Sequence, residues 1–265
     1  MLIEFGRIRI TRGPKENRFR PAVDPLFRSA AYAYGSRVIG IILSGALDDG
    51  TAGLWAVKHF GGIAIVQDPM EASVASMPES ALREVKVDHC LPISGIAEKL
   101  VDLVRPGRNV IAEPRKDERV EREIEIAKEE NAFERNIMKF GNLSPYTCPE
   151  CHGVLTALHD GTIERYRCHT GHAFSADTLL SAVSESVEES IYSAIRGMDE
   201  SIILLNHMGD HLAEKNEMKL AASYFKKAQQ TNERATQLRK LVLNHEQLNQ
   251  QNLKEEAHRH ENPGE

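Results

Sequence analysis

Three of the four cysteines lie close together with a histidine, at a spacing typical of a metal site. Cys148 and Cys151 are separated by two residues, and Cys168 stands four positions before His172. Between the two pairs lies Asp160-Gly161, a dipeptide that favours a tight β-hairpin turn. A hairpin brings its ends together, so the four side chains are expected to converge on one ion. Thiolate and imidazole ligands favour Zn²⁺, and four protein ligands leave no position for water, so we predict a structural zinc ribbon over residues 144–175.

Other readings of these residues stay open. The cysteines can be structural without a metal, and His169 can replace His172 as the fourth ligand. His152 and His159 are expected at the surface. Cys90 stands apart from the cluster in an apolar segment, and we expect it to be part of the core.

A second group with chemical potential is the pair Asp48 and Asp49, which follows an apolar run rich in β-branched residues. In open α/β sheets, ligand-binding and catalytic groups gather in the loops after the strands. A carboxylate there can orient a histidine in a Ser-His-Asp relay, bind a metal, or cap the following helix. The residues by themselves leave these three roles open.

The elements that must position the aspartates are predicted as alternating strands and helices. The expected strands are 2–10, 38–43, 63–66 and 88–91, and the expected helices are 24–34, about 51–60, one from 77, and about 94–104. Asp24 is expected at the N-cap of the first helix and Ser94 at the N-cap of the last, with Gly35 ending the first. This alternation predicts an α/β fold with an open, mostly parallel sheet.

The rest of the chain changes character twice. Residues 105–143 are predicted as a charged linker, with a solvated connecting helix over 115–140 and a docking role as the alternative. Residues 176–265 are predicted as helical because two apolar stripes recur at three- and four-residue steps. The stripes are Val183, Val187, Ile191, Met198, Ile202 and Leu205, then Leu220, Tyr224, Ala228, Thr231, Ala235, Leu238 and Val242. A turn within 209–216 would form a helical hairpin or coiled-coil tail; dimerisation through the same stripes is the alternative.

The composition limits the classes of partner. The net charge of -6 gives no overall attraction to nucleic acid. No apolar run approaches the ~20 residues that span a bilayer, and Met1 to Phe5 do not begin a signal peptide. We therefore expect a cytoplasmic protein with reduced thiols, and no membrane insertion.

Several runs in residues 7–104 occur together in one enzyme family. They are Gly13-Pro14, the stretch from Arg20 to Ala31, the stretch from Val38 to Gly45, Asp49 to Leu54, Gly61-Gly62, Gln67-Asp68-Pro69, Met77-Pro78 and Ala81-Leu82. In this order they resemble the C-terminal part of the chemotaxis protein-glutamate methylesterases (CheB-type), here placed at residues 1–104. The resemblance implies Ser-His-Asp hydrolysis of glutamate methyl esters on chemoreceptor helices, with release of methanol. It implies that Asp49 is the catalytic aspartate and that the backbone N–H of Ala46 is an oxyanion donor.

The chain departs from this family in one respect. The family's serine lies in a Gly-x-Ser-x-Gly-Gly turn, and neither that turn nor the family's histidine loop occurs in these 265 residues. The sequence therefore predicts an incomplete methylesterase domain, weakly active or inactive by itself, with an upstream catalytic fragment or self-association through the helices as a partner. The alternative is a non-catalytic signalling adaptor built on the zinc ribbon and helices. The family's phosphorylatable receiver domain is not expected in this chain.

Overall fold

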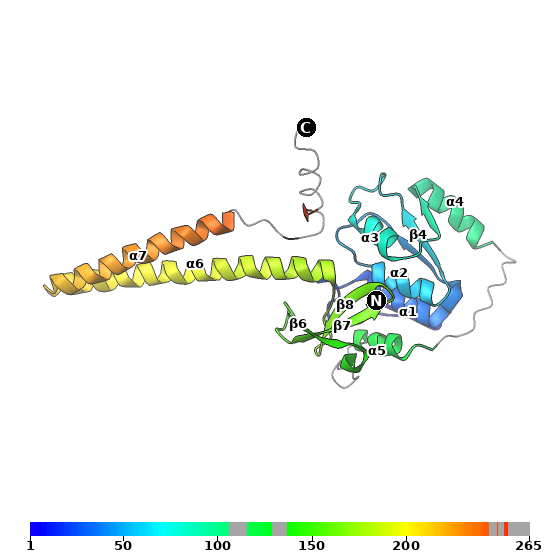
Figure 1. Ribbon diagram of the computed structural model, residues 1–265, viewed down its shortest axis with the longest axis horizontal. Coiled ribbons are helices and arrows are strands. Elements are labelled where there is room, and N and C mark those ends of the chain that lie inside the picture. The colour runs from blue at the N-terminus through cyan, green and yellow to red at the C-terminus, as the bar shows by residue number, and fades with distance from the viewer. Residues whose placement is uncertain (106–115, 129–136, 244–247, 249–251, 254–265) are drawn as a thin grey trace. The chain divides into compact units, whose positions relative to one another are not determined.

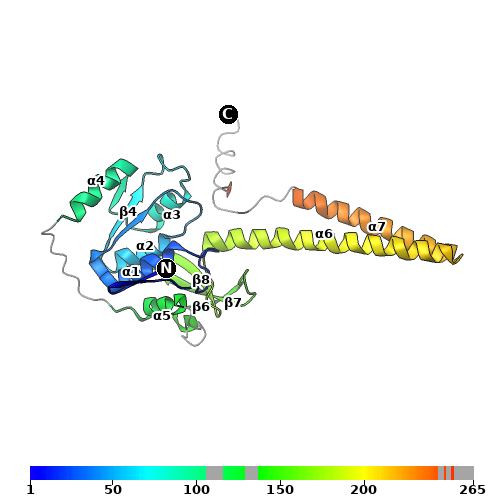
Figure 2. The same ribbon diagram turned by 180° about the vertical axis from the view of Figure 1, so that it is seen from behind.

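The structure, a computed structural model, describes residues 1–105, 116–128, 137–243, 248 and 252–253. These residues form two compact units, Met1–Leu180 and Ser181–Glu265. The first unit contains the α/β part and a Cys/His sheet, and the second consists of long helices. Figures 1 and 2 show the elements of each unit from opposite sides.

A parallel sheet carries the α/β part, as the sequence predicts. Its strands are β3 (Ile39–Ile42), β4 (Ile63–Gln67) and β5 (His89–Leu91), in the order β3-β4-β5. Ile39 aligns with Ile63, and Ile65 with His89, both in parallel register. Four helices accompany the strands: α1 (Val23–Tyr34), α2 (Thr51–His59), α3 (Ser76–Glu84) and α4 (Ile93–Leu103); the 3-10 turn η1 (Gly35–Arg37) follows α1.

Four local predictions need correction. Residues 2–10 form an antiparallel hairpin of β1 (Leu2–Glu4) and β2 (Arg7–Arg9), because Gly6 adopts a positive φ and turns the chain. Helix α4 begins at Ile93 with Pro92 at its N-cap, two residues before Ser94, the expected N-cap. Cys90 is exposed because β5 lies at the edge of the sheet.

The fourth correction concerns the charged segment after residue 115, which was expected to be a solvated connecting helix. Residues Glu118–Ala127 form α5, and Val120, Ile124 and Ile126 on it are buried. Val120 and Ile124 join Ala31, Ala56, Val57 and Phe60 of the α1–α2 region in one apolar cluster. The rest of the predicted linker, 106–115 and 129–136, lies outside the described residues.

The Cys/His sheet comprises four antiparallel strands in sequence order: β6 (Asn142–Thr147), β7 (Val154–Asp160), β8 (Ile163–Cys168) and β9 (Ala173–Ser175). The 3-10 turn η2 (Ile137–Phe140) precedes it. The β7–β8 turn falls at Asp160-Gly161 with Gly161 at a positive φ, as predicted.

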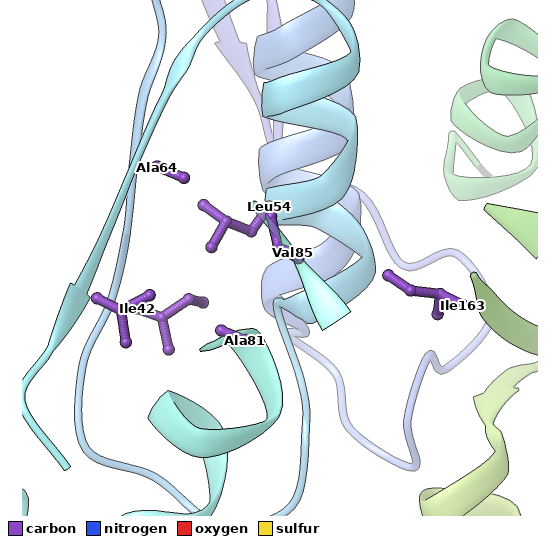
Figure 3. Close-up of a cluster of buried hydrophobic side chains, with 7 residues drawn as sticks. Ile42, Leu54, Ala64, Ala81, Val85 and Ile163 are labelled. Atoms are coloured by element: carbon purple, nitrogen blue, oxygen red, sulfur yellow. The ribbon is translucent and has the colours of Figure 1, made fainter. Parts of the chain in front are cut away.

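The α/β part and the Cys/His sheet share a core. Ile163 of β8 belongs to the same apolar cluster as Ile42, Leu54, Ala64, Val66, Ala81 and Val85 (Figure 3). At the adjacent turn, a Cβ on Gly161 would lie only 2.8 Å from Nε1 of Trp55 on α2. The tip of the β7–β8 hairpin is therefore packed tightly against α2.

A buried network of ions joins the same parts of the first unit. Its members are Glu16, Arg28, Glu123, Asp160, Arg165 and Arg167, all buried. Glu123 lies at the centre: Arg165 reaches its two oxygens at 2.8 and 3.1 Å, Arg167 at 3.1 Å and Arg28 at 3.2 Å. Because each charge is paired, the network avoids the large cost of burying a lone ion.

The second unit contains most of α6 (Ala176–Glu214), together with α7 (Met218–Leu243), which forms a long helical hairpin with it. The chain turns at residues 215–217, at the end of the predicted interval, with Asn216 at a positive φ. Ala221, Ala228, Ala235 and Val242 are buried on α7, and Arg239 of α7 pairs with Asp199 of α6 at 2.6 Å. None of the helices in the described part of the chain combines the length and the apolar character that a bilayer span requires.

Candidate functional site

Asp49 lies in the loop of residues 44–50, which we call the aspartate loop, after the C-terminal end of β3. One of its carboxylate oxygens accepts a hydrogen bond from the backbone N–H of Val23 at 2.8 Å. The other faces the N–H of Asp24 at 3.4 Å and the side-chain amide of Asn17 at 3.3 Å. Asp49 thus caps α1, whereas capping of the helix that follows it, α2, was one of the roles considered from sequence.

Asp24 does not cap its own helix, contrary to the prediction, because Ala22 occupies the N-cap of α1. Its carboxylate instead accepts a 2.6 Å hydrogen bond from the N–H of Gly53 in the first turn of α2, and a 2.8 Å bond from the amide of Asn17. Helices α1 and α2 therefore exchange caps: each first turn is satisfied by an aspartate that precedes or begins the other helix.

Asp48 is buried, and its side chain faces the first turn of α6. Its carboxylate accepts a 2.8 Å hydrogen bond from the hydroxyl of Thr178, in the first turn of α6, while its carbonyl accepts one from the N–H of Thr51. Ser175 in turn caps α6, since its hydroxyl accepts the N–H of Thr178 at 3.0 Å. The aspartate loop is thereby tied to the junction between β9 and α6.

The proximity of these carboxyl groups changes their acidity. Burial, reinforced by the charge of Asp49, raises the pKa of Asp24 to about 7. Burial also raises the pKa of Asp48 and of Asp49, against the hydrogen bonds that they accept. The negative charge of one carboxylate disfavours ionisation of the other, so the titrations of Asp24 and Asp49 depend on each other.

The groups needed to complete a Ser-His-Asp relay are not found beside Asp49 among the described residues. His59 stacks on Trp55, with ring centroids 4.8 Å apart, and its Nε2 lies 3.1 Å from Asp117. The hydroxyl of Ser44 is bonded to the backbone of Val74. Ala46, the predicted oxyanion donor, is exposed within the aspartate loop.

The four predicted metal ligands come together. Ligand atoms of Cys148, Cys151, Cys168 and His172 all lie within 4.8 Å of one another. Sγ of Cys151 is 3.6 Å from Sγ of Cys168, and Nδ1 of His172 is 3.7 Å from the sulfurs of Cys148 and of Cys168. A tetrahedral zinc ion with Zn–S bonds of about 2.3 Å requires sulfur separations near ~3.8 Å. The cluster has the dimensions of a Cys₃His site that can bind a metal ion.

The thiols of Cys148 and Cys168 shift each other's acidity in opposite directions. The hydrogen bond with Cys168, followed by burial, raises the pKa of Cys148, so Cys168 is the first of this pair to ionise. Hydrogen bonding from Cys148, and then from His172, lowers the pKa of Cys168 to about 3 although burial opposes it. The alternative ligand His169 lies outside the cluster, with its ring against Gly153, where an added Cβ would meet it at 2.4 Å. Backbone N–H groups of Gly153 and Gly171 point at the sulfurs of Cys151 and Cys168.

Two residues that contact the aspartates, Asn17 and Thr178, were not predicted from the sequence. Asn17 touches Asp24, Asp49 and β9, and Thr178 touches Asp48. Their partners are up to 158 residues away along the chain. The turn residues around Asn17 carry no pattern that reveals such a partner, so only the folded chain identifies them.

The N-terminal part of the chain is similar in sequence to known proteins. Residues 1–100 match the family described as CheB methylesterase. A relative from Leptospira interrogans is 44% identical over 91 residues, which are 34% of this chain and 47% of the relative. The protein-glutamate methylesterase/protein-glutamine glutaminase 2 of Xanthomonas campestris is 43% identical over 94 residues, 36% of this chain and 27% of the relative.

Among solved structures, the crystal structure of the Thermotoga maritima CheB methylesterase catalytic domain shares 43% identity, covering 33% of this chain and 47% of that chain, with a TM-score of 0.33. The chain spans about half the length, or less, of the relatives that it matches. The matched residues include β3, the aspartate loop and α2, and they end before α5 and the Cys/His sheet. The first hundred residues of this chain therefore resemble the CheB methylesterases, and the remainder lies outside that likeness.

Proposed function

We propose that this chain contributes the aspartate loop of a protein-glutamate methylesterase, which hydrolyses glutamate methyl esters on chemoreceptor helices and releases methanol. The observation that carries the proposal is the place of Asp49 at the C-terminal end of β3, within the segment matched to the CheB methylesterases. In open parallel sheets this edge gathers catalytic groups. The relatives are also named protein-glutamine glutaminases, and deamidation of glutamine uses the same acyl-transfer chemistry.

In this mechanism a serine attacks the ester carbonyl, a histidine transfers the proton, and Asp49 orients the histidine. The N–H of Ala46 stabilises the developing oxyanion. Asp49 is half-buried, and two helix N–H groups and an amide hold its carboxylate in one orientation. Since this sequence holds no Gly-x-Ser-x-Gly-Gly turn, we propose that the chain is weakly active or inactive alone.

Two arms test this proposal through methanol release from a methylated receptor fragment. The purified chain alone is expected to release methanol at the background rate. The same chain combined with the serine- and histidine-bearing half of a related methylesterase domain is expected to be active. The matched control is Asp49→Asn, which keeps the shape and one capping oxygen but loses the charge.

Loss of the serine relay costs several orders of magnitude in rate, so the first arm has a wide margin. Turnover by the chain alone that Asp49→Asn abolishes would show that the chain carries its own nucleophile. Turnover in the combined sample that is indifferent to Asp49→Asn would remove Asp49 from the mechanism.

We propose in addition that Cys148, Cys151, Cys168 and His172 hold one structural Zn²⁺. The tetrahedral dimensions of the cluster, the two cysteine-bearing turns and the buried position of two of the cysteines support this assignment. Four protein ligands leave no open coordination position, so the ion would close the Cys/His sheet and would not take part in chemistry.

For the second unit we propose a coiled-coil hairpin within one chain. The buried residues of α7 that face α6 recur at seven-residue steps, 221, 228, 235 and 242, as in a coiled-coil seam. At Gly209 of α6 an added Cβ would meet the ring of Phe225 at 2.6 Å, so the helices approach closely near the turn. We place the whole chain in the cytoplasm, where the methylated receptor helices would be its partners.

A further inference from the structure

Asn17 joins the Cys/His sheet to both capping aspartates. It is buried and adopts φ 50. Its side-chain oxygen accepts the N–H of Ser175 at 3.1 Å, while its side-chain nitrogen donates to Asp24 at 2.8 Å and Asp49 at 3.3 Å. Both ends of one amide are thus used, with β9 on one side and the two helix caps on the other.

The segment next to Asn17 is paired with the strand that follows the last cluster residue. Ala173 comes directly after His172; its N–H donates to the carbonyl of Lys15 at 3.1 Å, and its carbonyl accepts the N–H of Asn17 at 2.8 Å. Glu16 therefore forms a parallel β-bridge with Ala173 of β9. Displacement of β9 would either break these hydrogen bonds or move Asn17 with the strand.

The same segment also contacts both cysteine-bearing turns. The ammonium of Lys15 pairs with Glu150, between the first two cysteines, at 2.9 Å. Arg167 donates to the carbonyl of Gly171 in the other turn at 2.7 Å and to Glu16 at 2.8 Å. The cluster geometry is consequently transmitted to residues 15–17 through three independent contacts.

We propose that Asn17 is a positioning residue through which closure of the Cys/His cluster by a metal ion holds the aspartate loop in place. This inference rests on the proposed metal site. With the ion bound, β9 presents the N–H of Ser175 to Asn17, and the first turn of α6, which follows β9 directly, presents the hydroxyl of Thr178 to Asp48. Without it, β9 loses its anchor at His172, and the caps that Asp49 and Asp24 provide to α1 and α2 loosen. The Cys/His module thereby regulates the loop that carries the proposed catalytic aspartate.

Linkage makes the proposal quantitative. If the bound ion stabilises the closed caps, disruption of the caps must weaken ion binding by the same factor. Asn17 touches none of the four cluster residues in the contacts described, so a change in zinc affinity on its substitution reports coupling rather than loss of a ligand.

The test measures hydrogen exchange at two backbone amides in the full chain, by NMR, with zinc bound and after chelation. The amides are Val23, capped by Asp49, and Gly53, capped by Asp24. In the wild type we expect exchange at both to rise about tenfold or more on chelation. In Asn17→Gly we expect fast exchange with or without zinc, together with weaker zinc binding.

The matched control is Asn216→Gly, the same substitution at φ 61 in the turn of the helical hairpin. It should retain the full response to zinc. Thr178→Val, which keeps the shape of the side chain but removes the hydrogen bond to Asp48, provides a second variant should Asn17→Gly fail to fold. We expect it to reduce the response to zinc while one zinc per chain is retained.

Zinc content and exchange separate the two proposals. A chain that binds no zinc removes the metal site and this inference with it. A chain that binds one zinc, but whose Val23 and Gly53 amides change less than twofold on chelation, keeps the metal site and overturns the coupling. A full response to zinc in Asn17→Gly would also overturn it.

Discussion

Replacement of Glu123 by glutamine tests whether the buried ion network holds the first unit together. The carboxylate of Glu123 faces three guanidinium groups, those of Arg28, Arg165 and Arg167, at 2.8 to 3.2 Å. Burial by itself raises the pKa of Glu123, but the charges of Arg165, Arg28 and Arg167 outweigh burial and hold it well below its ordinary value. The group is therefore ionised at neutral pH, and Glu123→Gln removes a full negative charge.

The expected loss of stability in Glu123→Gln depends on the charges that remain buried. After the substitution, Glu16 and Asp160 remain as counter-charges of the three buried guanidinium groups among the described residues, and Asp160 also pairs with Arg119. Removal of one partner from a buried pair typically costs about 3–5 kcal/mol, because the other charge stays buried without compensation. For a unit of this size, each kcal/mol lowers the midpoint of thermal unfolding by about 2–4 °C, so a loss of roughly 6–20 °C is expected.

Unfolding by urea, followed through the fluorescence of Trp55, provides the assay. Trp55 is the only tryptophan in the chain. It lies between α5, whose Arg119 is 6.0 Å from its ring centre, and the β7–β8 turn, so its emission reports separation of these parts. The matched control is Glu118→Gln, also on α5, where the carboxylate is mostly exposed and pairs with Arg122 at 3.5 Å. An exposed pair of this kind contributes about 0–1 kcal/mol.

Equal, small losses in the two variants would refute this reasoning. A loss of stability below about 1 kcal/mol for Glu123→Gln would mean that the desolvation penalty of the buried charges equals the free energy gained from their attraction, as is known for some buried ion pairs. Glu123 would then specify the packing of α5 without stabilising it.

Three further predictions concern Asp24, the turn at Gly161 and the Cys/His cluster. The pKa of Asp24 is raised from 3.8 to about 7, so between these values the folded state holds the proton while the unfolded state releases it. The free energy of unfolding should therefore fall as pH rises from about 4 to about 7. Equilibrium unfolding at several pH values should show this slope, and Asp24→Asn should reduce it. Gly161→Ala should lower stability by about 1–3 kcal/mol and alter tryptophan emission, because the residue has a positive φ and its Cβ would contact the indole. The control Gly197→Ala, within α6 where an added Cβ meets no neighbour, should raise stability by about 0.5–1 kcal/mol. An unchanged melting temperature for Gly161→Ala would contradict the packing described. Elemental analysis should find one zinc per chain, which is lost in Cys151→Ser and retained in Cys90→Ser. Calorimetry should show a lower melting temperature after the zinc is removed by a chelator. Equal zinc content in the two variants would refute the assignment.

Much of the α/β part was predictable from local pattern. The apolar runs at 38–43 and 63–66, together with Gly35 and Gly61-Gly62, predicted the positions of β3 and β4 because buried parallel strands require continuous apolar runs and glycine ends helices. Convergence of the two cysteine pairs was equally predictable, since a hairpin with its turn at Asp160-Gly161 brings both ends together. These features depend on residues near one another in the chain.

The burial of α5 was not predictable in the same way. Its charged residues suggested a solvated helix, and only the fold supplies Arg28, Arg165 and Arg167 as partners for Glu123. Cys90 illustrates the converse, because an apolar strand is exposed when it lies at the edge of the sheet. Whether a given side chain is buried depends on what packs against its element, which a local pattern does not contain.

The sequence by itself predicted which residues can do chemistry: the Cys₃His set through its spacing, and Asp49 through the resemblance of residues 7–104 to the CheB-type methylesterases. Tertiary structure alone decided what holds them. The amide of Asn17 reaches Asp24, Asp49 and Ser175, and Thr178 reaches Asp48 from 130 residues away. A hydrogen bond requires only that two groups meet in space with the right geometry, and distance along the chain does not enter its energy. Periodicity and motifs therefore predict candidate reactive groups, while the contacts that orient them emerge only when distant segments pack.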